Sequence, residues 1–525
     1  MKKFKVKILS LPVIANNRSL LLYVFFLQAL IFAAYILLYK LYMPRVNAFG
    51  CFDDCSEFMA GYFMLKGKIL YSQIFFNHQP LGAYMSYLIQ LISRPINIYE
   101  LVLRHRQFVF LFSLVFNLLL IARYRLIGFA FALFYEFSKF YVFGDRFLPE
   151  ALIIYPTIYM TGLVWYKFSS RKSYAVDYVL SGVFVWFIIF AREPYIPLAV
   201  FLYGLILWSR RFLKAKIISL AVFICLSSVM LLTLPIKDYL FNVFTVNITA
   251  LSNGSFKLHV FQSVFYPFFI FTKTGEWNIF RYTIIGLDVI FVILSILLVT
   301  RFRKFKLFII AYVILILANL RPESPGTIFY AAFHMISWYA CFIFLVLLML
   351  REAYGLVNKI FYPLLVLFIG LFFYLIFSPQ SFVHEHINTH DEYIVNYGYV
   401  MQVGDVVRAL SKPSDTLFLD GFDDIIYWEA KRMSPYRYSW YTSFMPGFSV
   451  YNKARIEMFA HNPPDFYYGT CAQGGGYPTM PKKYLNDYTR LYSGKNLSCL
   501  YIRKQKLDTI TKNQWASANA LFYHL

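Results

Sequence analysis

Long apolar stretches separated by short polar segments fill the chain up to residue 378. The stretch from Leu20 to Tyr39 carries no charged residue, and about 20 apolar residues in a helix cross the core of a bilayer. It exceeds the apolar region of a cleaved signal peptide, about 7 to 15 residues, so we expect it to remain as a span. Further apolar stretches lie near residues 105–122, 126–143, 150–166, 178–191, 194–209, 217–235, 283–300, 307–320, 328–350 and 360–378. The pattern predicts a polytopic α-helical membrane protein with about eleven transmembrane helices.

Residues 379–525 follow a different, mostly polar pattern. Helix-compatible stretches such as Val403–Leu410 alternate with short strand-like runs at Thr416–Leu419, Phe466–Tyr468 and Leu497–Ile502,. We therefore expect a membrane module over residues 1–378, with its first exoplasmic loop at 44–104. A soluble α/β or α+β domain is expected over residues 379–525.

The basic residues orient this topology. The chain is 59% hydrophobic and 15% charged, yet its formal net charge is +23, a combination that excludes a soluble nucleic-acid-binding protein. If the N-terminus is cytoplasmic, the short segments on that side carry basic residues at Lys2, Lys3, Lys5, Lys7, Arg18, Arg123, Arg125, Lys167, Arg171, Lys172, Arg210, Arg211, Lys214, Lys216, Arg301, Arg303, Lys304, Lys306, Arg351 and Lys359. The positive-inside rule then predicts the N-terminus inside and the tail outside.

Adjacent acids mark the first predicted exoplasmic loop. Asp53 and Asp54 follow the first span by about ten residues,, and carboxylates there can act as a general base or bind a cation. The alternative is a pair of acids favoured by the dipole at a helix N-terminus. Cys51 and Cys55 flank the acids, and a zinc site is an alternative for this pair although no nearby Cys or His completes a motif.

The spacing around these acids resembles the first loop of GT-C glycosyltransferases. The branch it resembles contains the protein mannosyltransferases, the aminoarabinose lipid A transferases and their bacterial relatives. Two departures are an Asp where the family often has Glu at the second acid and His78 where it often has Lys. The residues that carry the resemblance are Asp53, Asp54, Ala60, Gly67, Tyr71 and the turn His78-Gln79-Pro80.

Later segments extend the resemblance. Asp145 and Glu150 stand where such enzymes often carry acids that line the acceptor side. Arg321 and His334 are similar to an Arg…His arrangement at the exoplasmic end of late spans in bacterial members.

The resemblance implies inverting transfer of a sugar from a polyprenyl-phosphate donor to a glycan, lipid or protein acceptor. Asp53 is our choice for the general base, with Asp54 second. Cations at outer span ends are the candidates to bind the donor phosphate, and they are Arg321, His334, Arg104, His78 and Arg192. We expect no metal, no other cofactor and no nucleic-acid partner, and we place the site on the periplasmic face of a bacterial inner membrane.

Two other classes share the multispan plan. A transporter of lipid-linked sugars, or flippase, is expected to show inverted repeats and broken helices, which the sequence does not display. An O-antigen polymerase or ligase usually has its large outer loop between late spans, whereas here the large polar segment is C-terminal.

The orientation generates the first testable prediction. Cys471 and Cys499 lie in the tail, where an oxidising compartment would allow a disulfide between them. After reduction, a membrane-impermeant thiol reagent added from outside should label both. Labelling from the cytoplasmic side alone would contradict the predicted orientation.

Overall fold

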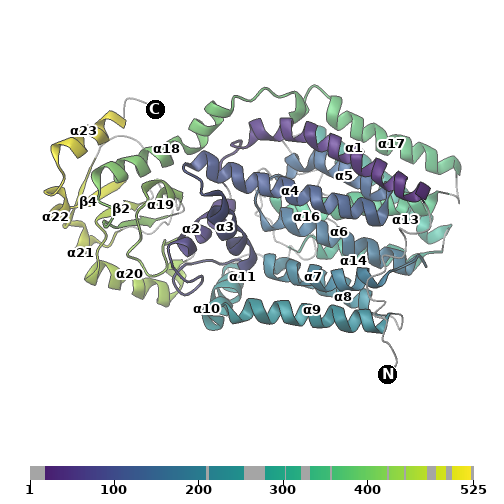
Figure 1. Cartoon of the computed structure of the whole chain (residues 1–525), viewed down its shortest axis with the longest axis horizontal. Helices are drawn as coiled ribbons and strands as arrows, with labels where there is room; N and C mark the ends of the chain where they lie inside the picture. The colour runs from purple at the N-terminus through teal and green to yellow at the C-terminus, as the bar shows by residue number, and fades with distance from the viewer. Residues whose placement is uncertain are drawn as a thin grey trace. The chain divides into compact units, whose positions relative to one another are not determined.

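The computed structural model describes residues 18–51, 53–208, 212–252, 278–301, 303–320, 332–354, 358–421, 425–442, 445–469, 480–491 and 499–521. The chain divides into two compact units (Figure 1). Unit 1 contains Met1–Met43, Gln107–Met230 and Ser255–His386, and unit 2 contains Pro44–Arg106, Leu231–Gly254 and Ile387–Leu525. The first loop and the tail thus belong to one unit.

Six described helices are long and apolar enough to cross a membrane, and the chain is a helical membrane protein. A helix satisfies its own backbone hydrogen bonds, as the bilayer core requires. The six spans are Ser19–Arg45, Ile98–Tyr124, Leu213–Leu232, Ile279–Thr300, Phe333–Ala353 and Ile360–His384. They lie on α1 (Arg18–Tyr42), α4 (Ile98–Tyr124), α9 (Leu213–Leu232), α13 (Asn278–Thr300), α16 (Ile336–Ala353) and α17 (Asn358–Phe377).

The other five apolar stretches are also helical but do not meet that measure. They form α5 (Leu126–Ser138), α6 (Pro149–Phe168), α7 (Ala175–Ala191), α8 (Ile196–Leu207) and α14 (Phe305–Leu317). The expected continuous span at 126–143 is interrupted, because α5 ends at Ser138 and a 3₁₀ helix follows over Lys139–Val142. Phe143 then has a positive φ of 57°, which ends the helical path. The count of eleven spans and their orientation stay predictions.

Helix α16 forms the centre of unit 1. Every residue of it except Arg351 is buried, and it packs against α5, α6, α13, α14 and α17. A helix that is apolar all round is expected to be enclosed in this way.

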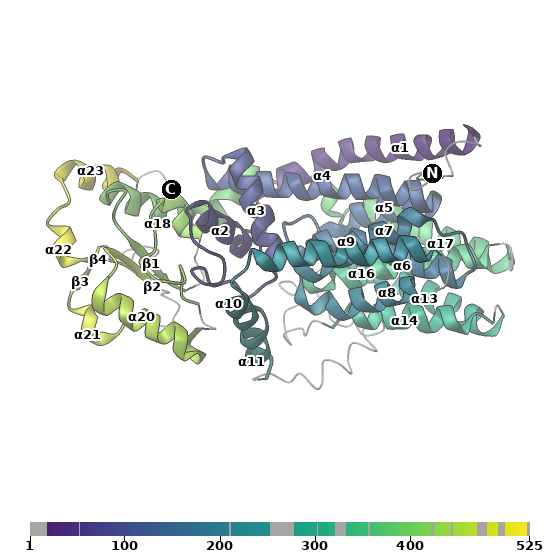
Figure 2. The ribbon, with the colours of Figure 1, turned by 60° about the horizontal axis from the view of Figure 1, so that its bottom comes forward.

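Unit 2 contains a four-stranded mixed sheet and flanking helices (Figure 2). Its strands are β1 (Leu417–Asp420), β2 (Phe466–Gly469), β3 (Tyr488–Arg490) and β4 (Leu500–Arg503), in the order β1-β2-β4-β3. Strand β1 is parallel to β2, whereas β2–β4 and β4–β3 are antiparallel. The longer helices of the tail are α18 (Thr389–Leu410), α20 (Ser449–His461) and α23 (Lys512–Ala520).

Three of these strands lie at or overlap the runs expected from sequence, and Val403–Leu410 is the end of α18. Strand β3 was not expected. That residues 379–525 form an exoplasmic domain of their own stays a prediction.

Two helices of the first loop pack closely against each other. They are α2 (Asp54–Leu65) and α3 (Pro80–Ser93). A Cβ added to Gly61 would lie 2.7 Å from the Ser86 hydroxyl, and one added to Gly82 would overlap the Glu57 carboxylate. Glu57 is buried against the first turn of α3, where the helix dipole favours a negative charge.

Gly61→Ala is therefore expected to destabilise the loop. Its added Cβ would lie 2.7 Å from the backbone N of Tyr87 and 2.9 Å from the carbonyl carbon of Ser86, and this overlap should cost about 1–3 kcal/mol of unfolding free energy, as overpacking usually does, and lower the melting temperature in detergent. Gly204→Ala in α8 is the control, because a Cβ there meets nothing within 4 Å. Equal melting of both variants would contradict the packing described.

Candidate functional site

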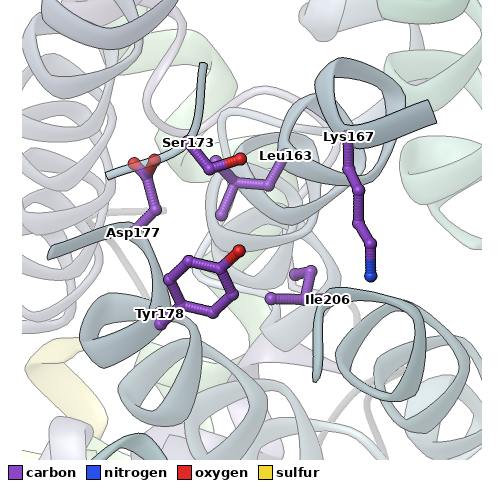
Figure 3. Close-up of a pocket in the computed structure, with 6 residues that line it drawn as sticks. All are labelled: Leu163, Lys167, Ser173, Asp177, Tyr178 and Ile206. Carbon is purple, nitrogen blue, oxygen red and sulfur yellow. The ribbon is translucent and has the colours of Figure 1, made fainter. Parts of the chain in front are cut away.

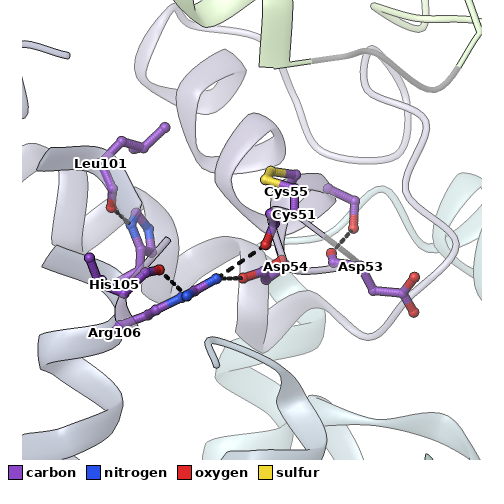
Figure 4. Close-up of a disulfide and its surroundings, with 10 residues drawn as sticks. Cys51, Asp53, Asp54, Cys55, Leu101, His105 and Arg106 are labelled. Carbon is purple, nitrogen blue, oxygen red and sulfur yellow. Dashed lines mark hydrogen bonds and ion pairs between the residues drawn. A yellow bond between two sulfur atoms is a disulfide. The ribbon is translucent and has the colours of Figure 1, made fainter. Parts of the chain in front are cut away.

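A disulfide brackets the acidic pair in the first loop. Cys51 and Cys55 are joined, with their Cα atoms 5.5 Å apart (Figure 4). Asp53 lies in the turn between them and Asp54 is the first residue of α2. Cys51, Asp54 and Cys55 bring one ligand atom each within 4.8 Å of the others. In the disulfide state, however, the sulfur atoms are not the thiolates that zinc binds.

Asp54 forms a buried ion pair with Arg106 of α4. Its Oδ2 lies 3.6 Å from Arg106 Nη2, and the two side chains are 1% and 3% exposed. Arg106 Nη2 also donates to the carbonyl of Gly50 at 3.3 Å, and Nη1 donates to the carbonyl of Val46. One guanidinium thus holds both the chain entering the site and the first acid of α2.

Asp53 has a different environment from its neighbour. It is half-buried, and its side chain points away from Arg106 (Figure 4). Its carbonyl accepts hydrogen bonds from Ser56 Oγ at 2.5 Å and Ser56 N at 3.2 Å, which closes the first turn of α2. Adjacent carboxylates in unlike environments can take unlike roles.

Arg106 is a residue that sequence reasoning missed in favour of Arg104. Arg104 is exposed on α4, whereas Arg106 lies on the buried face with Val102 and Val109. That face has the i, i+4, i+7 spacing of a packed helix stripe, and this spacing was the available signal.

The turn with His78 is held through neighbouring groups. His78 is half-buried, and its carbonyl accepts a hydrogen bond from Tyr71 Oη at 2.8 Å. Next to it, buried Gln79 accepts a hydrogen bond from Tyr239 Oη at 2.9 Å. Pro80 then starts α3 at its first position, where proline fits a helix well.

A tail segment packs directly on this loop within unit 2. Lys68 Nζ donates to Ser439 Oγ at 3.1 Å and to the carbonyl of Tyr436 at 3.2 Å. Phe75 N donates to the carbonyl of Tyr438 at 3.0 Å. Burial lowers the pKa of the Lys68 ammonium to about 8. This segment of the tail thus packs against the first loop.

Two of the candidate residues in unit 1 form a buried ion pair. Arg192 and Glu150 form an ion pair of 2.8 Å with side chains 2% and 0% exposed, and Glu193 lies 3.9 Å from Arg192. Asp145 is half-buried in the turn before α6. The structure therefore joins a predicted phosphate ligand to a predicted acceptor-side acid.

The late-span pair is described only in part. His334 is half-buried, and its carbonyl accepts a hydrogen bond from Tyr195 Oη at 3.4 Å. Arg321 lies outside the described residues, as does Cys471. Cys499 is disulfide-bonded.

A second buried pair was missed by the sequence reasoning. Lys139 Nζ lies 2.6 Å from Glu136 Oε2, and the side chains are 1% and 0% exposed. Tyr155 Oη and Asn117 Nδ2 donate to Glu136 Oε1 at 2.7 and 2.9 Å. Two opposite charges three residues apart within an expected span were a signal, because such charges are costly there unless paired.

A small cavity elsewhere in unit 1 does not suit a substrate. It is lined by Leu163, Lys167, Ser173, Asp177, Tyr178 and Ile206 (Figure 3), and its volume is about 10 Å³. That is room for about one water molecule.

Comparisons of the chain with protein-family models, with curated proteins and with solved structures found no match. The likeness to GT-C enzymes stays a prediction.

Arg106→Gln and Arg104→Gln should separate the buried cation from the exposed one. Removing Arg106 leaves Asp54 buried without this partner, which should lower the unfolding free energy by about 3–5 kcal/mol. Arg104→Gln should change the unfolding free energy by no more than about 0.5 kcal/mol. Denaturant titration in mixed micelles measures the unfolding free energy of both variants. Similar values for the two would contradict a stabilising role of the Asp54–Arg106 ion pair.

Proposed function

We propose that the chain is an inverting GT-C-type glycosyltransferase that moves a sugar from a polyprenyl-phosphate donor to a hydroxyl acceptor. The carrying observation is the division between the two acids of the first loop. Asp54 is buried against Arg106, and Asp53 is half-exposed beside it. A general base must reach the acceptor hydroxyl, and the half-exposed Asp53 suits that role whereas the buried Asp54 does not.

The proposed transfer is a single displacement that needs no oxidant, reductant or cofactor. The acceptor oxygen attacks the anomeric carbon from the face opposite the carrier, and its proton passes to the Asp53 carboxylate. The bond from that carbon to the phosphate oxygen breaks, and the electron pair leaves with polyprenyl phosphate. The anomeric configuration is inverted. Asp54 acts through Arg106 as a positioning residue.

The departing phosphate needs hydrogen-bond donors or cations at a membrane surface. Arg104 and His78 suit this role by exposure, since one is exposed and the other half-buried. Arg192 already pairs with Glu150, so its better-supported role is to fix that acid. His334 and Arg321 stay candidates for the phosphate, and Asp145 and Glu150 for the acceptor side. The proposal places all of this on the periplasmic face of an inner membrane.

Asp53→Asn tests the proposal in proteoliposomes with a labelled polyprenyl-phosphate sugar. Loss of the base should slow carrier release by about 10²–10⁴-fold. Glu457→Gln is the matched control, since Glu457 is an exposed acid of α20 in the same unit, and it should release carrier at the wild-type rate.

Three results would contradict this account. Equal release by Asp53→Asn and wild type removes the base assignment. Passage of intact sugar lipid across the bilayer without release favours the transporter class, and growth of a lipid-linked polymer favours the polymerase class.

A further inference from the structure

Three arginines surround one tyrosine where α6 and α16 end in unit 1. The guanidinium carbons of Arg123, Arg171 and Arg351 lie 5.2, 5.5 and 5.1 Å from the centroid of the Tyr166 ring. Lys304 belongs to the same group through Glu352. We call these four cations the arginine cluster.

The cluster has fewer counter-charges than cations. Asp177 accepts two hydrogen bonds from Arg123, at 2.8 and 2.9 Å, and the carbonyl of Lys172 accepts a third at 3.1 Å. Glu352 is shared between Arg171, at 3.3 Å, and Lys304. Arg351 donates to the Tyr166 hydroxyl and makes no ion pair with any described residue. Four cations therefore meet two carboxylates.

Part of this positive charge faces outward. The side chains of Arg171 and Lys304 are 33% and 34% exposed. Within the described part of the chain, Arg171 Nε also has no hydrogen-bond partner. Like charges gathered this closely repel one another, so an anion that bridges them would be stabilised.

The surroundings of the cluster are those of a membrane interface. The spans Ile98–Tyr124 and Phe333–Ala353 both end here. Exposed apolar rings adjoin the cluster in sequence, with Phe168 37%, Phe305 54% and Tyr354 61% exposed. Aromatic rings favour the headgroup level of a bilayer, and cationic pockets between helix ends bind anionic lipid headgroups.

We propose that the arginine cluster binds the phosphate of an anionic phospholipid headgroup. The guanidinium forks of Arg351 and Arg171 take the phosphate oxygens, and the exposed rings contact the upper acyl chains. This site is independent of the proposed transfer reaction, and it uses no residue of the first loop.

Lipid retention tests the proposal. Full-length protein in nanodiscs of phosphatidylcholine with added phosphatidylglycerol is extracted, and bound lipid is measured by native mass spectrometry. Wild type should retain phosphatidylglycerol selectively. Replacing both Arg171 and Arg351 by Gln should weaken retention about 10- to 30-fold, as expected for two basic residues at a lipid surface.

The matched control is Arg125→Gln, because Arg125 is an exposed arginine two residues after Arg123. It should keep wild-type retention. The single variant Arg351→Gln, which leaves the ion pairs of Glu352 intact, should lose about fivefold and serves if the double variant fails to fold. Equal retention by Arg351→Gln and Arg125→Gln would overturn the site. Equal retention of phosphatidylcholine and phosphatidylglycerol by the wild type would overturn the assignment to an anionic phospholipid.

Discussion

The buried ion pair between Asp54 and Arg106 fixes the start of α2, and the candidate site depends on it. A charge removed from water is costly unless it is paired and hydrogen-bonded. Here the same guanidinium also holds two carbonyls of the entering chain, so the loop has one well-defined path into the helix. The same path positions Asp53, because Asp53 lies between Cys51 and Cys55, immediately before the first residue of α2.

The tail contributes to the same site by packing. Lys68 reaches three oxygens of the segment that begins at Ser434, and the Phe63 ring contacts Tyr427 and Trp440 with centroids 5.3 and 5.7 Å apart. The tail therefore packs against the first loop.

Periodicity and hydropathy were sufficient to predict that the eleven apolar stretches form helices, because a helix satisfies its own backbone hydrogen bonds in a bilayer. They were not sufficient for α5, which ends at Ser138 inside the apolar stretch and is followed by a 3₁₀ helix over Lys139–Val142. Strand β3 was missed because three residues are too few for a period-2 pattern, and its pairing with β4 supplies the order.

The loop pattern singled out the two acids as candidates, whereas it could not predict which side chains contact them. Arg104 and Arg106 are alike in sequence and differ only in the face of α4 on which they lie. Likewise, Arg192 stands beside Glu193 in the chain but pairs more closely with Glu150, 42 residues away. Such choices depend on tertiary packing, which a local pattern does not encode.

The central claim is that the two acids have separate roles, and turnover and melting measured together test it most directly. Purified Asp53→Asn and Asp54→Asn would be compared with wild type in carrier release and in thermal unfolding. The account predicts that Asp53→Asn loses turnover with an unchanged melting temperature, whereas Asp54→Asn lowers the melting temperature. Wild-type turnover in Asp53→Asn, or wild-type melting in Asp54→Asn, would contradict it.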